Sequence, residues 1–524
     1  MEKENYTPEM QKFLDEFIAI GDKDKNLNSG NDKMLHTALW YEKFRRAMED
    51  QEDHLIFKNA ISRIVRRRYA LAFSNTVESL FDGLMNELAW ADYINLDSLT
   101  DEQVTEIKSI IGRYIVLLNS VKSHSLENDA SKIIIGWMAC EIDELLFCHK
   151  RQELIVDFAY NCLRENLQFG PGNFNQKEIE IQLKLAILTL VFKPDYNYAQ
   201  FWLTKKIFPE FSNFNLTQAQ EIGFHFENII SQINKVFKNI HSKDYLLYAK
   251  RQIAPFILIK ELPNYQSNLT AISKDPIKLR DALVDVYDSL LMKTRDKVWR
   301  GTIRAFIFIF LTKISLAFII EMPFDQYLRG SIDYIPLIIN IGFPPVLMFL
   351  SGISVKTPPS SNHQIVINAI NNLITYQRID SKPFYIGIKH RSTGEKIFDF
   401  LYLVFNFGIV IGVILLLRKI GFNFVSILLF FTFVSAVSFF AFRIRNVALE
   451  LLMRVSRDNF LVSLIEFVFL PFILIGKIIS SAITKSNPFT ITLDFLIEAP
   501  LKTIIKISNS WLRFVRQKKE DLDI

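Results

Sequence analysis

Cysteine, glycine and proline are all scarce in this sequence of 524 residues, which has 3, 18 and 17 of them. Three cysteines, Cys140, Cys148 and Cys162, are too few for a disulfide framework or for a zinc site with four thiolate ligands. They lie in one helical region, and we expect reduced, buried thiols. Low glycine and proline together with 46 phenylalanines argue against disorder, because the chain has enough apolar surface to offset the entropy lost on folding.

Recognisable catalytic motifs are also missing. The sequence contains no GxxxxGK[ST], HExxH, GxSxG or paired CxxC motif, and it lacks the two Glu-x-x-His motifs of a di-metal bundle. The histidines His54 and His149 follow acidic residues at spacings that are not diagnostic. The formal net charge of +5 is small for this length, so nucleic-acid binding is not expected. We therefore expect a protein that is not an enzyme and has no cofactor or metal.

Alternating apolar and polar runs bounded by turn residues are absent, which predicts an all-α fold. The N-terminus, MEKENYTPEMQKF, has no apolar h-region, so no secretory signal is expected and the soluble part should stay in the cytoplasm. We expect a polar segment at 1–30 and a cytoplasmic helical bundle or array at 31–275. The GPGNFN stretch suggests a break between subdomains near 170–175.

The C-terminal part of the sequence is rich in long apolar runs. Four have the length and apolarity of membrane spans: Ile303–Ile320, Ile335–Val355, Phe398–Leu417 and Phe424–Phe442. They predict a small polytopic bundle made of two transmembrane hairpins, 303–355 and 398–442, joined by a cytoplasmic loop at 356–397. Asp275 and Pro276 begin a helical pattern, so 276–300 is predicted to be a stalk helix continuous with the first span.

A fifth apolar run, Phe460–Ile475, contains Glu466 and Pro471. We predict a re-entrant or interfacial segment at 460–499, with Pro471 as its turning point. Residues 500–519 have the pattern of a basic amphipathic helix on the membrane surface. Its expected contacts with anionic lipid are Lys502, Lys506, Arg513 and Arg516.

Lysine and arginine gather before the first span, between the second and third, and after the fourth. The positive-inside rule places these regions in the cytoplasm. The prediction is a multi-pass protein of the cell membrane with both its N-terminal domain and its C-terminus in the cytoplasm. Frequent Asn, Ile, Lys and Phe are compatible with a bacterial genome of low GC content.

Polar residues inside the predicted spans form the candidate functional site. Lys313 lies near the middle of the first span, where inserting a charged side chain into the bilayer costs about 2.5 to 3.5 kcal/mol. Three alternatives are open for this lysine: it snorkels to the interface, lines an aqueous path, or forms an ion pair inside the bundle, for which Glu466 is the best candidate partner. The second span is predicted to be interrupted at Asn340, Pro344 and Pro345. Either the helix is discontinuous and its freed carbonyls line a path for an ion or substrate, or the helix has a static kink that packs against its neighbours.

A second candidate is a basic patch in the soluble part, formed by Arg63, Arg66, Arg67 and Arg68. It could hold phosphates, anionic lipid or the carboxylates of a partner. The alternative is a solvated helix face paired with acidic residues of a neighbouring helix.

Two functions remain open from the sequence. The first is a membrane-anchored scaffold whose cytoplasmic domain binds an unknown protein partner. The alternative is a transporter or channel with a path near Lys313, the Pro344/Pro345 break and Glu466. Because so few spans would have to enclose a path, the alternative requires a homo-oligomer.

Overall fold

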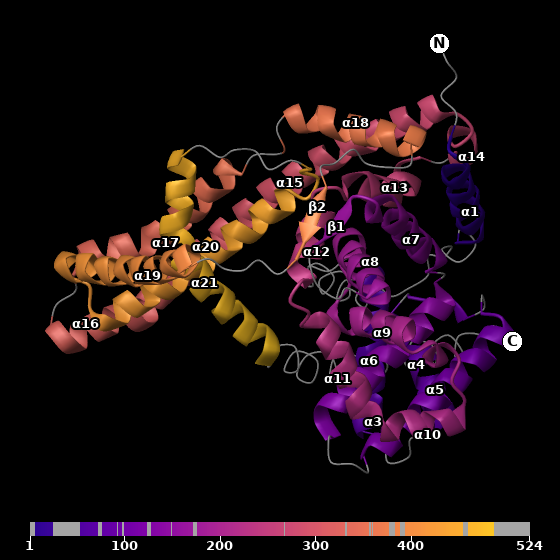
Figure 1. Cartoon of the computed structure of the whole chain (residues 1–524). Helices are drawn as coiled ribbons and strands as arrows, with labels where there is room; N and C mark the ends of the chain where they lie inside the picture. The colour runs from indigo at the N-terminus through magenta and orange to yellow at the C-terminus, as the bar shows by residue number, and fades with distance from the viewer. Residues whose placement is uncertain are drawn as a thin grey trace, which may run out of the picture. The chain divides into compact units, whose positions relative to one another are not determined.

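The computed structural model describes residues 6–486 apart from 25–52, 72–75, 92, 97–98, 123–126, 148, 171–174, 267, 331–332, 356–357, 359, 377–382, 388–392 and 454–459. The protein is predominantly α-helical, as predicted (Figure 1). Its chain divides into two compact units, one comprising residues 1–287 and 363–388, the other residues 288–362 and 389–524. We call them the soluble unit and the membrane unit.

The soluble unit is a helical array with one small sheet. Its elements are α1 (Pro8–Asp24), α3 (Asp53–Leu71), α4 (Val77–Trp90), α5 (Asp101–Lys122), α6 (Glu127–Leu146), α7 (Lys150–Arg164), β1 (Leu167–Phe169), α8 (Gln176–Phe192), α9 (Tyr196–Ile207), η2 (Pro209–Ser212), α10 (Leu216–Phe224), α11 (Phe226–Phe237), α12 (Ser242–Lys250), α13 (Ala254–Tyr265), α14 (Leu269–Ile272), most of α18 (Ser360–Tyr376) and β2 (Phe384–Ile386).

Side-chain caps mark where several of these helices begin. Thr76 and Asp195 each accept a hydrogen bond from the backbone N–H three residues later, and Asn215 forms a capping box with Gln218. Each cap satisfies an N–H that the first turn leaves without a partner. The core lies around α6, where Trp137 is fully buried and packs edge-on against Phe211 of η2.

The N-terminal segment differs from the prediction. Residues 1–30 were expected to be a separate polar segment, but Pro8–Asp24 forms the amphipathic helix α1. Its Met10, Phe13 and Phe17 are buried, and the Phe13 ring stacks on Phe158 of α7 with centroids 4.1 Å apart. The apolar positions alternate three and four residues apart, which gives the helix one apolar face for the core.

The expected break near 170–175 does not divide the soluble unit, which continues through it. Instead, β1 precedes this stretch and pairs in parallel with β2, with Leu167 opposite Phe384 and Phe169 opposite Ile386. The Gly170 N–H donates to the Ile386 carbonyl at 2.8 Å. Gly170 and Gly387 approach so closely that a Cβ built on Gly387 would lie 3.3 Å from the Gly170 Cα.

This pairing corrects the prediction that 356–397 is only a loop. Residues 363–388, which follow the second predicted span, fold as part of the soluble unit.

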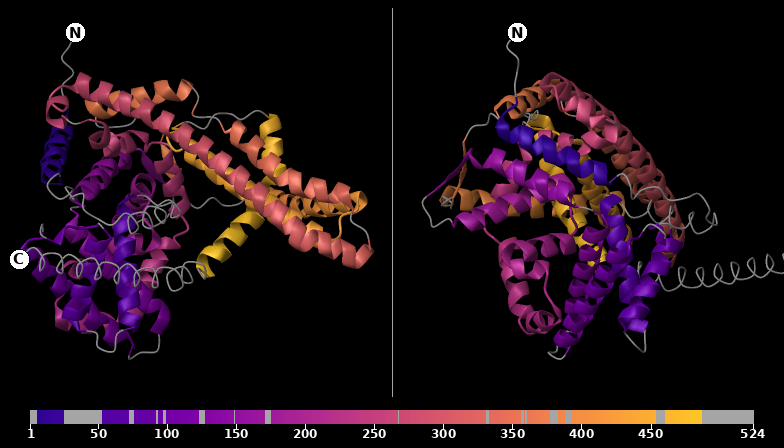
Figure 2. Two further views of the ribbon diagram at one scale, coloured as in Figure 1. Left: turned by 180° about the vertical axis from the view of Figure 1, so that it is seen from behind. Right: turned by 90° about the vertical axis from the view of Figure 1, so that its right-hand side faces the viewer.

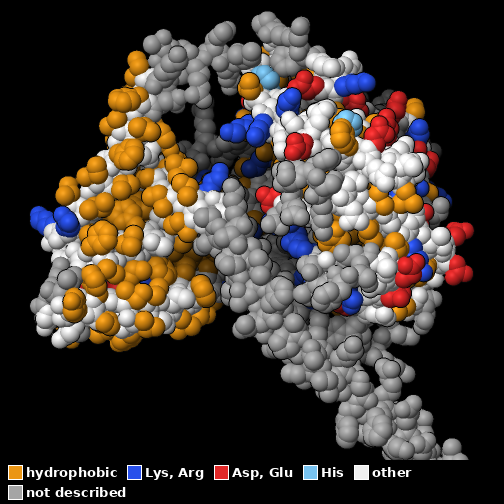
Figure 3. Space-filling view, turned by 90° about the horizontal axis from the view of Figure 1, so that it is seen from below, with side chains coloured by type: hydrophobic (Ala, Val, Ile, Leu, Met, Phe, Trp, Pro, Cys, Tyr) orange, Lys and Arg blue, Asp and Glu red, His pale blue; other side chains and the backbone are white. Residues whose placement is uncertain are grey.

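The membrane unit contains most of α15 (Pro276–Leu316), followed by the π-helical turn η3 (Ala317–Glu321), α16 (Met322–Arg329), α17 (Tyr334–Ser354), α19 (Thr393–Ile420), α20 (Phe424–Ala448) and α21 (Phe460–Ser486). Four helical stretches are long and apolar enough to cross a membrane, namely 276–327, 334–354, 400–420 and 424–448. They match the four predicted spans. Figure 3 shows hydrophobic side chains crowding the visible face of these helices, whereas charged residues are interspersed over the soluble unit.

The long first helix forms as the sequence predicts, because α15 continues through Gly301 without a break. The packing of the membrane unit depends on close approaches at glycine: a Cβ built on Gly352 of α17 would lie 2.0 Å from Thr302 Cγ2 of α15. In the views of Figure 2, α17 packs on α20, and α20 on α21. The α19–α20 turn at Gly421 lies beside Pro336 and Asp333 at the start of α17.

Candidate functional site

Lys313 is fully buried in the membrane unit and its charge is compensated. Its Nζ lies 2.9 Å from Glu321 Oε1, and the exposed fractions of the two side chains are 0% and 1%. The same ammonium lies 4.8 Å from the centroid of the Phe433 ring of α20, within the range of a cation–π interaction. The charged residue that insertion scales penalise is thus paired inside the protein.

The π-helical turn positions Glu321 for this pair. Glu321 follows Lys313 by eight residues, which is about 12 Å along a regular helix. Helical side chains lean toward the N-terminus, so the Glu321 carboxylate extends back toward Lys313. The turn Ala317–Glu321 ends at this residue and passes directly into α16. Such π turns are often found at functional sites.

Asn340 joins the ion pair to two further helices. Its Nδ2 donates to Glu321 Oε2 at 2.7 Å and to the Ser426 carbonyl of α20 at 3.2 Å. Two acceptors on one side fix the orientation of the amide, since the reverse orientation would place oxygen against oxygen. Asn340 Oδ1 therefore points elsewhere, and this buried atom has no donor among the residues that the structure describes.

A second buried hydrogen bond joins Asn423 of α20 to Asp325, which follows Glu321 by about one helical turn. Asn423 caps α20 by accepting from the Ser426 N–H at 2.7 Å, and its Nδ2 donates to Asp325 of α16. Asp325, Asn423 and Ser426 are all buried. The membrane unit thus contains a connected polar cluster, which we define as Lys313, Glu321, Asp325, Asn340, Asn423 and Ser426.

The structure brings together Lys313 and Asn340 but gives Lys313 another partner than the predicted Glu466. The predicted partner belongs to α21, and its side chain is outside the described residues. The sequence pattern predicts an outer loop at Glu321–Tyr334, because this stretch carries three acidic residues, Glu321 among them, against Arg329 alone. The signal that could have found it was a lysine two helical turns earlier in the same helix.

The interrupted helix predicted at Pro344 and Pro345 is wrong, whereas the alternative of a static kink within a continuous helix stays a prediction. The helix α17 continues from Tyr334 to Ser354 with both prolines buried inside it. Pro471 likewise lies inside α21, so the turn predicted there does not form. Proline is tolerated inside a helix at membrane depth, because neighbouring helices and side chains can bind the backbone groups whose hydrogen bonds proline removes.

Comparisons with protein-family models, with curated proteins and with solved structures gave no match. Function must therefore be inferred from the chemistry of the described residues.

The basic patch of the soluble unit is largely engaged in ion pairs. Arg67 and Arg68 of α3 both bind the Glu87 carboxylate of α4, and Arg68 Nε donates to it at 2.9 Å. Arg63 is half-buried and Arg66 is exposed. This arrangement favours the solvated, paired helix face over a phosphate site. The predicted lipid contacts Lys502, Lys506, Arg513 and Arg516 lie outside the described residues.

Buried ionisable groups of the soluble unit cluster on α6. Arg113 and the Tyr114 hydroxyl both bind the Glu141 carboxylate, at 2.7 and 2.8 Å. Burial raises the pKa of Glu141 to about 7, against the opposing effects of Arg113 and Tyr114. Burial is the largest single effect on the pKa of His149 and lowers it, but the hydrogen bond to Asp143 at 2.9 Å and the negative charges of Asp143 and Glu144 together raise the net pKa. His149 is thus mostly buried rather than a surface histidine.

Two of the cysteines, Cys140 and Cys162, are buried free thiols, as expected. Cys148 is outside the described residues. Within the described part of the chain, no group of three or more His, Cys, Asp or Glu side chains is placed to hold a metal ion.

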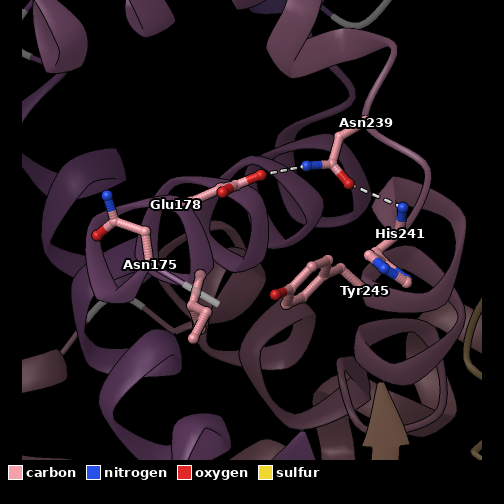
Figure 4. Close-up of a pocket in the computed structure, with 6 residues that line it drawn as sticks. Asn175, Glu178, Asn239, His241 and Tyr245 are labelled. Carbon is pink, nitrogen blue, oxygen red and sulfur yellow. Dashed lines mark hydrogen bonds between the residues drawn. The ribbon is translucent and has the colours of Figure 1, made fainter. Parts of the chain in front are cut away.

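A small hollow lies at the start of α8, lined by Asn175, Glu178, Ile179, Asn239, His241 and Tyr245 (Figure 4). Its polar groups bind one another: Asn239 donates to Glu178, and the His241 backbone N–H donates to Asn239 Oδ1 at 2.8 Å. These bonds join the loop after α11 to α8. The hollow therefore serves packing, and the polar cluster of the membrane unit is the better functional candidate.

Proposed function

We propose that this chain is a non-enzymatic integral membrane protein whose soluble helical unit, held in the cytoplasm, is a partner-binding or scaffold module. The observation that supports this proposal is the way the chain joins the two units. It passes from one to the other near residues 287, 362 and 388, so three covalent connections hold the soluble unit at the membrane.

A single tether would let a domain of this size move over a wide volume. Three connections restrict it, and the β1–β2 ladder incorporates the last of them into the fold of the soluble unit. A partner bound there would be kept close to the bilayer. This is the property that a membrane-anchored scaffold requires.

Site-specific photo-crosslinking in cells tests the proposal with the full chain. A crosslinking amino acid is placed at Phe224 or Ile240, which are 68% and 86% exposed on the soluble unit. Discrete protein adducts from at least one position are expected. Phe308, also 68% exposed but on a spanning helix, is the matched control and should label lipid. If Phe224, Ile240 and further exposed positions of the soluble unit give no protein adduct, the scaffold proposal fails.

A second candidate is transport through a homo-oligomer, which the buried polar cluster favours. Ionisable residues at membrane depth commonly mark the paths of ions or protons. Here Lys313 and Glu321 are joined to α17 and α20 through Asn340.

Flux assays on the purified protein in liposomes test transport. The variant that combines Lys313→Met with Glu321→Leu removes both charges and should fold, since replacing a buried ion pair by apolar residues is often neutral. Ion flux that disappears in this variant, but persists when the exposed Lys419 is changed to Met, would support transport. Unchanged flux in the double variant would exclude the cluster as the path.

A further inference from the structure

The buried face of α17 has more hydrogen-bond acceptors than donors at the level of Asn340. The first surplus acceptor is Asn340 Oδ1, which is fully buried and has no donor among the described residues. Glu321 and the Ser426 carbonyl already occupy the amide nitrogen, so this oxygen cannot be satisfied by turning the side chain.

Two main-chain carbonyls add to the surplus. In an α-helix the carbonyl of residue i accepts from the N–H of residue i+4. Pro344 and Pro345 have no N–H, so the carbonyls of Asn340 and Ile341 lose their regular donors. Both prolines and Asn340 are buried, so this turn of α17 lies in the interior of the membrane unit. In a membrane, such groups need another partner, because lipid supplies no hydrogen bonds.

We propose that this turn of α17 binds a small monovalent cation through Asn340 Oδ1 and the carbonyl oxygens of Asn340 and Ile341. Carbonyl oxygens that replace the hydration shell of an ion are the basis of cation sites in channels and in transporters with irregular helices. The site lies beside the Glu321 carboxylate, which shares the Asn340 side chain. Binding at this site requires no transport.

Charge balance decides the class of ion. The Glu321 carboxylate is already neutralised by Lys313, so an added ion brings its whole charge into the protein. Dipoles of neutral carbonyls can stabilise one positive charge, whereas two in a medium of low dielectric constant would be far more costly. Na⁺ or K⁺ is therefore expected to bind, and Mg²⁺ or Ca²⁺ is not.

The test is the thermal stability of the purified full chain in detergent, with Na⁺, K⁺ or N-methyl-D-glucamine at equal ionic strength. A ligand that binds only the folded state raises the unfolding temperature. For a dissociation constant of about 10 mM, about 150 mM Na⁺ or K⁺ should raise it by about 3 to 6 °C over N-methyl-D-glucamine. The readout is the reactivity of a cysteine introduced by Ser438→Cys, a buried position of the membrane unit, in a background without the native cysteines.

The decisive variant combines Pro344→Ala with Pro345→Ala. It restores two N–H donors to the surplus carbonyls, so the protein should be more stable in N-methyl-D-glucamine and should lose most of the shift caused by the alkali cation. Pro336→Ala is the matched control. The N–H that Pro336 lacks would bind the carbonyl of residue 332, which precedes α17 and is not part of the proposed site. Pro336→Ala should therefore leave the full response to the alkali cation.

Three results would overturn the proposal. The first is a wild-type protein whose unfolding temperature is the same in all three monovalent salts, as expected if a water molecule satisfies Asn340 Oδ1. The second is a cation response that the double proline variant retains in full. The third is a larger shift with Mg²⁺ than with Na⁺ and K⁺, which would exclude a monovalent site.

Discussion

Removing one charge of the Lys313–Glu321 pair should damage the membrane unit more than removing both. Among the described residues, Lys313→Met leaves the buried Glu321 carboxylate with Asn340 alone as its partner, and Glu321→Leu leaves the Lys313 ammonium with the Phe433 ring alone. The exposed fractions of the two side chains are 0% and 1%, so water cannot compensate for the lost partner. Breaking a buried pair in this way costs about 3 to 5 kcal/mol.

The double variant should recover most of that loss. Two apolar side chains of similar size leave no buried charge, and such replacements are often neutral or stabilising by about 1 to 4 kcal/mol. Asn340 loses one acceptor but keeps the Ser426 carbonyl. A double-mutant cycle should therefore give a coupling energy of several kcal/mol. Two independent sites would have a coupling energy close to zero, because their individual costs add.

The assay is unfolding of the full chain in mixed micelles of dodecyl maltoside with increasing dodecyl sulfate, read through the same cysteine at position 438. This probe reports on the membrane unit alone, which avoids treating a protein of two units as two-state. If the two single variants each unfold within about 1 kcal/mol of the wild type, the pair is not buried as described.

The remaining predictions concern pH, packing and topology. The folded-state pKa of Glu141 is about 7, above its ordinary value of 4.5, so its contribution to stability is complete below pH 4.5 and is lost as the pH rises through 7. Glu141→Gln should remove up to about 3 kcal/mol of this pH dependence, as measured by Trp137 fluorescence during urea unfolding, and an unchanged slope would contradict the raised pKa. Gly476→Ala should destabilise the membrane unit by about 1 to 3 kcal/mol, because its Cβ would lie 2.2 Å from the Ser435 carbonyl oxygen, whereas Gly412→Ala meets nothing within 4 Å and should be tolerated. Cysteines introduced at Gly330 and Gly421 should react with an impermeant reagent from one side of the membrane, and a cysteine at Tyr385, which is 68% exposed on β2, from the other. Labelling of all three from the same side would contradict the topology.

The predicted helices agree best with the structure where the sequence has a regular apolar period and a clear cap. The apolar period predicts a helix at Lys177–Phe192, and the structure has α8 there within one residue. It also predicts one helix at 129–166, where the structure has two, α6 and α7. A short interruption between two amphipathic helices changes neither their period nor their composition, so the pattern could not reveal it. The helix α9, absent from the prediction, is largely buried and has no polar face to produce a period.

The sequence by itself determined the helical class and the number of spanning helices, because the length and apolarity of a run are local properties that the bilayer selects. It also identified Lys313 and Asn340 as costly residues. Only the tertiary structure decided that Glu321 is the partner of Lys313 and that residues 363–388 belong to the soluble unit. The first depends on a local π turn and the second on contacts between segments far apart in the chain, and the hydrophobic period of the sequence shows neither.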